Sequence, residues 1–165
     1  MEDAFAHHVW ATLRLVDSCL ALSSQQLETT VPGTYGSILD TLRHCVGSDA
    51  WDLFVATGDR TSLIDEGDME LPELRAAMET HGPAWSRLLA QDLDPDTVLH
   101  EVDETDGYTR DVAMSIQLAG ALQHGTDHRS QVCTALTALG IEPPHIDVIN
   151  FGIQAGLVEE ITPAS

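Results

Sequence analysis

Two histidines spaced four residues apart carry the clearest chemical signal in this sequence. His124 and His128 lie inside a long stretch of helical periodicity, so their side chains share one face with Cβ atoms roughly 5–6 Å apart. Two imidazoles placed in this way can converge on one divalent transition metal. The spacing is equally consistent with structural histidines, and a metal site would need a third ligand from elsewhere in the chain.

The residues around this pair exclude some common enzyme classes. The helix of a zinc protease carries a glutamate directly after its first histidine, where it acts as general base. This chain reads His124-Gly125-Thr126-Asp127-His128, so we reject the protease interpretation. The sequence also contains no Gly-x-Gly-x-x-Gly motif, no phosphate-binding loop and no Ser-His-Asp set that spacing could identify.

Two other histidines are candidates for the third ligand. His44 is the better one, although it lies about 160° from the centre of the apolar stripe of its predicted helix. It therefore belongs either to a polar outer face or to a pocket wall, and periodicity does not decide between them. His81 lies in an apolar row, where a hydrogen-bonded core histidine is expected, and is the reserve ligand. The remaining histidines are expected at the surface: His7, His8, His100 and His145.

The elements that must position these residues are mainly helical. Apolar residues at helical spacing predict four long helices, the first capped by Asp3, the second starting near 34–37 and ending before Gly58. The third starts near Glu70 and should kink or split at Gly82-Pro83. The fourth runs from about 114 to 139. Smaller elements are expected as a short turn or single helical turn at 23–27, a small hairpin or extended excursion of 98–102 and 108–112 about Asp106-Gly107, and a last amphipathic piece at 147–157.

Composition limits both the class of protein and its partners. The chain has 165 residues, of which 43% are hydrophobic, which suits one all-α domain over 1–165, a four-helix bundle. With 27 acidic residues, 7 arginines and no lysine, its net charge is −20, which disfavours nucleic acid and anionic membranes as partners. The acidic N-terminus is unlike a signal peptide, so we expect a cytoplasmic location. The three cysteines form no Cys-x-x-Cys pair and are expected to be small buried residues.

Two stretches of sequence resemble one known family. Residues 35–51 read YGSILDTLRHCVGSDAW, and residues 122–132 read LQHGTDHRSQV, followed by LGIEPP at 139–144. They resemble the Gly-Ser-x-x-x-Thr-Leu-x-His and His-x3-His-Arg-x-Gln signatures of the DinB/YfiT-like superfamily. The resemblance implies an up-down-down-up four-helix bundle that often forms a homodimer. It also implies a nickel, zinc or iron-type site made by His44, His124 and His128.

The resemblance also guides the expected function. Three imidazoles leave positions open on a divalent ion, where water could be activated or a thiol acidified. Relatives include S-transferases that use bacillithiol, mycothiol or glutathione, so we expect a metal-dependent thiol S-transferase in detoxification or stress response. The alternatives are a metal-dependent hydrolase and a non-catalytic, stress-induced metal-binding dimer. Other relatives, the mycothiol-dependent maleylpyruvate isomerases, have glutamate in place of His124, which makes that activity less expected.

Three polar residues near the histidine pair have open roles. Asp127 and Gln131 could orient a histidine N–H, with a solvated face as the rival interpretation for Asp127. Arg129 could pair with an acid or hold a carboxylate of a cosubstrate. No catalytic residue can be named from the sequence.

Overall fold

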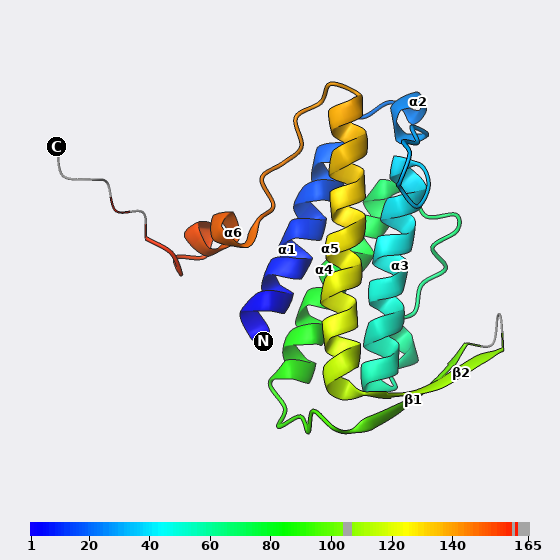
Figure 1. The fold of residues 1–165 in the computed structure, drawn as a ribbon, viewed down its shortest axis with the longest axis vertical. Coiled ribbons are helices and arrows are strands. Elements are labelled where there is room, and N and C mark those ends of the chain that lie inside the picture. The colour runs from blue at the N-terminus through cyan, green and yellow to red at the C-terminus, as the bar shows by residue number, and fades with distance from the viewer. Residues whose placement is uncertain (104–106, 160, 162–165) are drawn as a thin grey trace.

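The four predicted long helices are all present in the computed structural model, which describes residues 1–103, 107–159 and 161 (Figure 1). They are α1 (Glu2–Cys19), α3 (Ile38–Thr57), α4 (Leu71–Leu89) and α5 (Met114–Ala138). The shorter elements are α2 (Ser24–Leu27), the 3-10 turn η1 (Arg60–Ser62), β1 (Val98–Asp103), β2 (Tyr108–Ala113) and α6 (Val148–Gln154). None of the helices in the described part of the chain combines the length and hydrophobicity of a membrane span.

The helices run in the predicted up-down-down-up order. In Figure 1, α1 and α5 run in one direction, and α3 and α4 run in the other. Because α3 and α4 are parallel, the segment between them, residues 58–70, has to return along the length of the bundle. This return segment passes beside α3 (Figure 1). The fold predicted from the sequence, a four-helix bundle with a small hairpin before the last long helix, is confirmed.

The helix ends follow local chemistry, with one departure from the predictions. Ser37 forms a capping box with Asp40 at the start of α3, and Gly58 ends that helix with φ 72°. Asp3 is not a cap, because α1 begins at Glu2 with Met1 in the N-cap position. Asp3 therefore lies in the first turn of the helix. Of the kink or split predicted at Gly82-Pro83, the split does not occur, because α4 continues through Pro83 to Leu89. The ring of Pro83 is exposed, so solvent can satisfy the backbone group that proline leaves unpaired.

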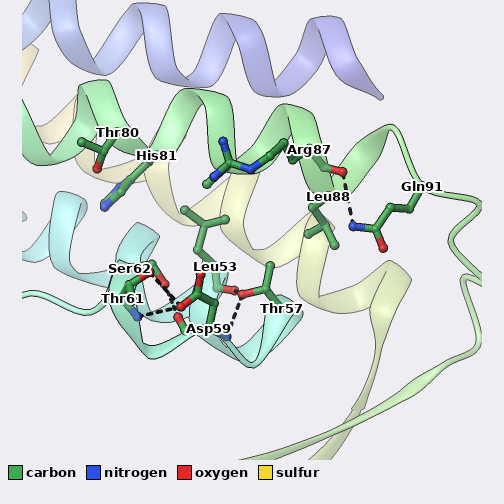
Figure 2. Close-up of a pocket in the computed structure, with 11 residues that line it drawn as sticks. Leu53, Thr57, Asp59, Thr61, Ser62, Thr80, His81, Arg87, Leu88 and Gln91 are labelled. Carbon is green, nitrogen blue, oxygen red and sulfur yellow. Dashed lines mark hydrogen bonds between the residues drawn. The ribbon is translucent and has the colours of Figure 1, made fainter.

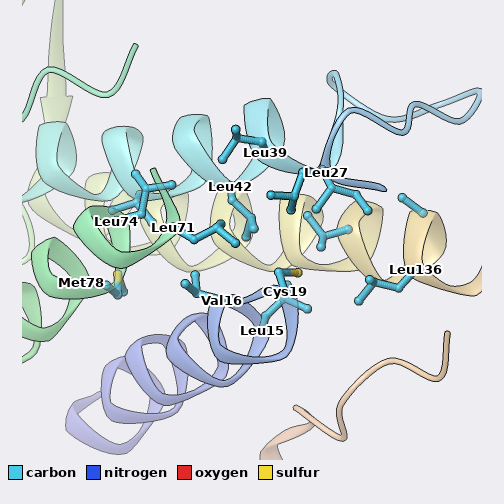
Figure 3. Close-up of a cluster of buried hydrophobic side chains, with 14 residues drawn as sticks. Leu15, Val16, Cys19, Leu27, Leu39, Leu42, Leu71, Leu74, Met78 and Leu136 are labelled. Carbon is cyan, nitrogen blue, oxygen red and sulfur yellow. The ribbon is translucent and has the colours of Figure 1, made fainter. Parts of the chain in front are cut away.

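Apolar side chains fill the bundle as two clusters, one toward each end. The first, shown in Figure 3, gathers residues of α1, α2, α3, α4 and α5, among them Leu15, Leu27, Leu42, Leu74 and Leu136. The second contains Phe5, Leu53, Trp85, Leu88, Met114 and Leu118. Burial of these side chains drives the packing, at roughly 25 cal/mol per Å² of apolar surface.

A layer of buried polar residues separates the two clusters, with one residue from each long helix. Asp49 accepts hydrogen bonds from His8 Nε2 at 2.8 Å and His81 Nδ1 at 2.7 Å, and from Trp85 Nε1 at 3.0 Å. Arg129 Nη1 lies 3.0 Å from His8 Nδ1. Because arginine only donates, His8 Nδ1 accepts from Arg129 and its Nε2–H donates to Asp49. Each of these four side chains is at most 4% exposed.

This layer corrects one prediction made from the sequence, for His8, and confirms another, for His81. His8 is 2% exposed and is not solvated as expected, because it carries the contact between Asp49 and Arg129. Burial alone would raise the pKa of Asp49, but the hydrogen bonds from His8 and His81 hold it below its ordinary value. His81 is the hydrogen-bonded core histidine that its apolar row predicted.

The hairpin and the C-terminal segment complete the fold. β1 and β2 pair antiparallel from Val98 opposite Ala113 to Asp103 opposite Tyr108, and Gly107 has φ +74°. The predicted hairpin is present, although Asp106 of the expected turn lies outside the described residues. α6 is shorter than the predicted 147–157 and is capped by Asp147. The hairpin extends beyond one end of the bundle, beside α3 and α5 (Figure 1).

Candidate metal centre

Three imidazoles from two helices meet in the groove between α3 and α5. His124 Nε2 lies 3.2 Å from His44 Nε2 and 3.0 Å from His128 Nε2. Their ligand atoms all lie within 4.8 Å of one another, and no other group of this kind occurs among the residues that the structure describes. The set brought together is the one that the motif resemblance named.

The position of His44 explains why periodicity could not select it. The apolar face of α3 points into the core through Leu42, Val46 and Leu53. The groove toward α5 lies on another side of the helix, and there His44 forms part of the wall of a cavity. Of the two alternatives left open by its place on the helix, the pocket wall is therefore the one observed.

The ring of His44 is held by neighbours outside the triad. Tyr35 stacks flat on it, with ring centroids 4.0 Å apart and an interplanar angle of 4°. The backbone N–H of Tyr35 donates to Gln131 Oε1 at 2.7 Å, so Gln131 acts on the site by holding Tyr35 in place. Glu66 Oε1 lies 3.9 Å from His44 Nδ1, at ion-pair distance and too long for a hydrogen bond. With Nδ1 facing Glu66, Nε2 is the nitrogen that faces the other two histidines.

Gly47 makes room for Glu66. A Cβ atom built on Gly47 would lie 1.0 Å from Glu66 Oε2. Any larger residue would therefore displace the carboxylate that the return segment places against α3 beside His44.

The electrostatics of the site favour neutral imidazoles, the form that binds a metal. Burial and the neighbouring His128 lower the pKa of His44. Burial, followed by the charges of His128 and His44, lowers the pKa of His124 to about 4. Burial also raises the pKa of the Cys45 thiol to about 12, so the cysteine next to His44 is neither a thiolate ligand nor a nucleophile at neutral pH.

The donor set fits a divalent transition metal. Three imidazole nitrogens suit zinc, nickel or iron and leave coordination positions for a further ligand. The Nδ1 atom of His128 is buried and has no hydrogen-bond partner among the described residues. Such an orphaned atom is costly in a closed core, and the contacts of the His128 ring are instead made on its Nε2 side, with His124 Nε2 and edge-on with Tyr35, where a metal would bind.

The triad lies at one end of a large cavity. About 810 Å³ of space extends from His44 and His124 along the α3–α5 groove to the hairpin, lined further by Ser48, Trp51, Asp52, Leu63, Glu66, Glu101, Arg110 and Gln117. A second pocket of about 320 Å³ lies between α3 and α4 (Figure 2). It is lined by Thr57, Asp59, Thr80, His81 and Arg87 among others, and its histidine is already bound to Asp49. The larger cavity is therefore the candidate for substrate.

The family comparison agrees with this geometry. The sequence matches the DinB family over residues 1–159. The chain belongs to the DinB family. Members of this family are often regarded as metal-dependent enzymes, which accords with the three-histidine group in the groove. The comparison with curated proteins gives no match.

Several sequence predictions around the site need correction or addition. Arg129 does not face the cavity: it is buried against His8, Thr12 and Thr126, so a cosubstrate carboxylate cannot reach it. Asp127 is exposed, in line with a solvated face. His100 and His145 are exposed as expected. Residues that the sequence did not single out line the site instead: Asp52, Glu66, Glu101 and Gln117.

Proposed function

We propose that this DinB-family chain is a divalent-metal-dependent enzyme that transfers a low-molecular-weight thiol to an electrophile. The observation that carries the proposal is the convergence of His44, His124 and His128 at one end of an open cavity of about 810 Å³. A structural zinc site is closed by four protein ligands, whereas a three-histidine site beside a cavity leaves a position for substrate. In this proposal the ion is zinc, nickel or iron, and the three histidines act as ligands.

A divalent ion held by the three imidazoles would supply Lewis acidity, which favours the thiolate form of a bound thiol. The chain's own residues keep the ligating imidazoles neutral, orient them and leave space for the electrophile. Burial keeps the rings of His44 and His124 neutral at physiological pH. Tyr35 stacks on the ring of His44, the carboxylate of Glu66 faces its Nδ1, and the cavity beyond it holds the electrophile next to the thiol.

The overall reaction is a substitution at the electrophile. The thiol sulfur forms the new bond to carbon, the leaving group departs with the electron pair of the bond that breaks, and the thiol proton passes to water. No oxidant or reductant is needed. The buried cysteines cannot take the place of the external thiol, because burial raises the pKa of Cys19 to about 11 and that of Cys45 to about 12.

Two other functions fit the same site. A hydrolase would use water instead of a thiol at the open position, and a non-catalytic metal-binding protein would use the site without turnover. The cavity favours an enzyme, since a site that only stores or senses a metal needs no space of this size. The choice of a thiol over water rests on the resemblance to known S-transferases.

Metal content provides the first test. Protein equilibrated with zinc, nickel or ferrous iron and then desalted should retain about one ion per chain by elemental analysis. His124→Ala should lose most of it, whereas His145→Ala, which changes an exposed histidine, should retain it. Full occupancy in a His44→Ala, His124→Ala double variant would reject the site.

Turnover provides the second test. Bacillithiol, mycothiol, glutathione and coenzyme A are each assayed with a generic alkylating electrophile, using metal-loaded and metal-free protein. We expect conjugation with at least one thiol, and its loss in metal-free protein and in His128→Ala. Equal rates with and without metal would reject the transferase, and metal-dependent loss of an ester or amide without thiol would favour the hydrolase.

A further inference from the structure

The cavity extends well beyond the three histidines. Ser48 and Asp52 follow His44 at intervals of one helical turn on α3, and both line the cavity. At about 1.5 Å per residue, Asp52 lies about 12 Å further along the helix than His44. On α5 the facing wall includes Gly120, where a Cβ atom would meet nothing within 4 Å. A ligand that reaches from the triad to Asp52 would therefore be extended, about 10 Å long.

The two carboxylates at the hairpin end of the cavity, Glu101 and Asp52, have different partners. Glu101 accepts from Trp51 Nε1 at 2.7 Å and pairs with Arg110 Nε, and Arg110 also donates to the Tyr108 hydroxyl at 3.0 Å. The one arginine of the cavity wall is thus bound to Glu101. Asp52 accepts from Gln117 Nε2 at 2.7 Å, but it forms no ion pair with any residue in the described ranges.

The charge of the cavity wall selects the sign of a ligand. Four carboxylates line it, namely Asp52, Asp65, Glu66 and Glu101, against the single arginine. An anionic group would be repelled at this end, and a cation would be attracted. The low-dielectric surroundings of a half-buried carboxylate increase both effects relative to water. A divalent ion at the triad would give the other end of the cavity the opposite preference.

We propose that Asp52 binds an ammonium group of the substrate, so that the preferred ligand is an extended aminothiol whose amine lies about 10 Å from its sulfur. This inference rests on the proposed function, because the thiol end requires the metal centre. The pKa of Asp52 in the absence of ligand agrees with this proposal. Burial, followed by the charges of Asp49 and Glu101, raises the pKa of Asp52 to about 7, although the charge of Arg110 and the hydrogen bond from Gln117 act in the opposite direction.

The test compares three thiols of one length in cobalt-loaded protein: aminooctanethiol, hydroxyoctanethiol and mercaptooctanoic acid. Binding is followed by the thiolate-to-cobalt charge-transfer band. We expect the amine to bind about five- to tenfold more tightly than the alcohol, which corresponds to about 1 kcal/mol, and the acid to bind most weakly. Asp52→Asn should reduce the amine preference to about one and leave the alcohol's affinity unchanged. Asp68→Asn, which removes the same charge at an exposed position of the return segment outside the cavity wall, should retain it.

A second measurement separates failure of this inference from failure of the proposed function. Octylammonium is titrated by calorimetry into metal-free protein, where we expect binding that Asp52→Asn abolishes. The amine preference should also rise from pH 6 to pH 8 as Asp52 ionises, facing Asp49 on α3, Glu101 on β1, Arg110 on β2 and Gln117 on α5. Absence of a charge-transfer band with all thiols would reject the metal-thiol function. Equal affinity for the three thiols, no octylammonium binding, or a preference that survives in Asp52→Asn would overturn the role of Asp52.

Discussion

The ring of Tyr35 lies parallel to the imidazole of His44, with 4.0 Å between centroids and 4° between planes. Tyr35 belongs to the loop before α3, so a residue outside the helices sets the orientation of one member of the triad. The same ring meets His128 edge-on, with centroids 5.6 Å apart. The ring of Tyr35 therefore restrains two of the three imidazoles, one by stacking and one by an edge-on contact.

This stack predicts a modest contribution to metal affinity. An aromatic pair contributes about 0.5–1.5 kcal/mol beyond its buried area, so Tyr35→Ala should weaken zinc binding about two- to tenfold. Tyr35→Phe keeps the ring and should bind zinc like the unmodified chain. Competition with a chromophoric chelator measures both. Equal loss in the two variants would assign the effect to the hydroxyl instead of the stack.

Gly47 and Glu66 should behave as one unit. Gly47→Ala would displace the Glu66 carboxylate, and Glu66→Gln would remove its charge while keeping its shape. Since Glu66 lies at ion-pair and not at hydrogen-bond distance from His44 Nδ1, its effect is electrostatic, and we expect each change to weaken zinc binding about two- to fivefold, which corresponds to about 0.5–1 kcal/mol. Asp68→Asn, an exposed acid in the same return segment, is the control for net charge. Unchanged affinity in both variants would show that Glu66 does not act on His44.

The two glycines of α5 provide a matched pair for stability. A Cβ on Gly125 would lie 2.3 Å from His8 Cε1 and 2.8 Å from Arg129 Nη1, inside the buried polar layer. Gly125→Ala should therefore lower the free energy of unfolding by roughly 2–3 kcal/mol. Gly120→Ala meets open space and should raise it by up to about 1 kcal/mol through helix propensity. Urea unfolding followed by circular dichroism compares them, and similar values for both would contradict the close contact with His8.

Asp52 predicts a pH dependence of stability. Its pKa is raised from 3.8 to about 7 in the folded chain, so the folded state holds the proton more tightly. Stability is therefore lost as pH rises from about 4 to 7 and stays low above that range. Asp52→Asn removes this loss. A shift of about three units corresponds to at most about 4 kcal/mol, and with solvent in the cavity we expect about 1–2 kcal/mol.

The measurement is the difference in unfolding free energy between Asp52→Asn and the unmodified chain from pH 4 to pH 8. This difference should be near zero at pH 4 and favour the variant at pH 8, and other titrating groups cancel in the comparison. A difference that does not vary with pH would contradict the raised pKa of Asp52.

Association of two chains is the remaining expectation. Exposed apolar residues on α6, including Val148 and Ile149, accord with a twofold dimer of the kind that the resemblance implies. Light scattering at micromolar concentration and moderate salt should give twice the chain mass. Low salt is unsuitable, because two chains of charge −20 repel each other.

The sequence predicted the bundle because each helix keeps its apolar period, and it predicted His124 and His128 because a four-residue spacing fixes a shared face. His44 needed a motif, since it faces a groove outside the apolar stripe. His8 was misjudged although a signal was present: it follows Phe5 by three residues and precedes Thr12 and Leu15 at helical spacing, in a buried row. Asp52 and Glu66 could not be found in this way, because their roles depend on how the hairpin and the return segment lie against α3.

The parallel direction of α3 and α4 has a consequence for how such a site can change. Two parallel neighbours require a return segment as long as the helices, and here that segment, together with the hairpin, forms much of the cavity wall while the helices hold the three imidazoles. The three metal ligands thus lie on helices, whereas the cavity wall is shared between α3, α5 and these two segments. Replacement of hairpin residues within 98–113, or of return-segment residues other than Glu66, should therefore change the substrate range while the three imidazoles and Asp52 stay in place.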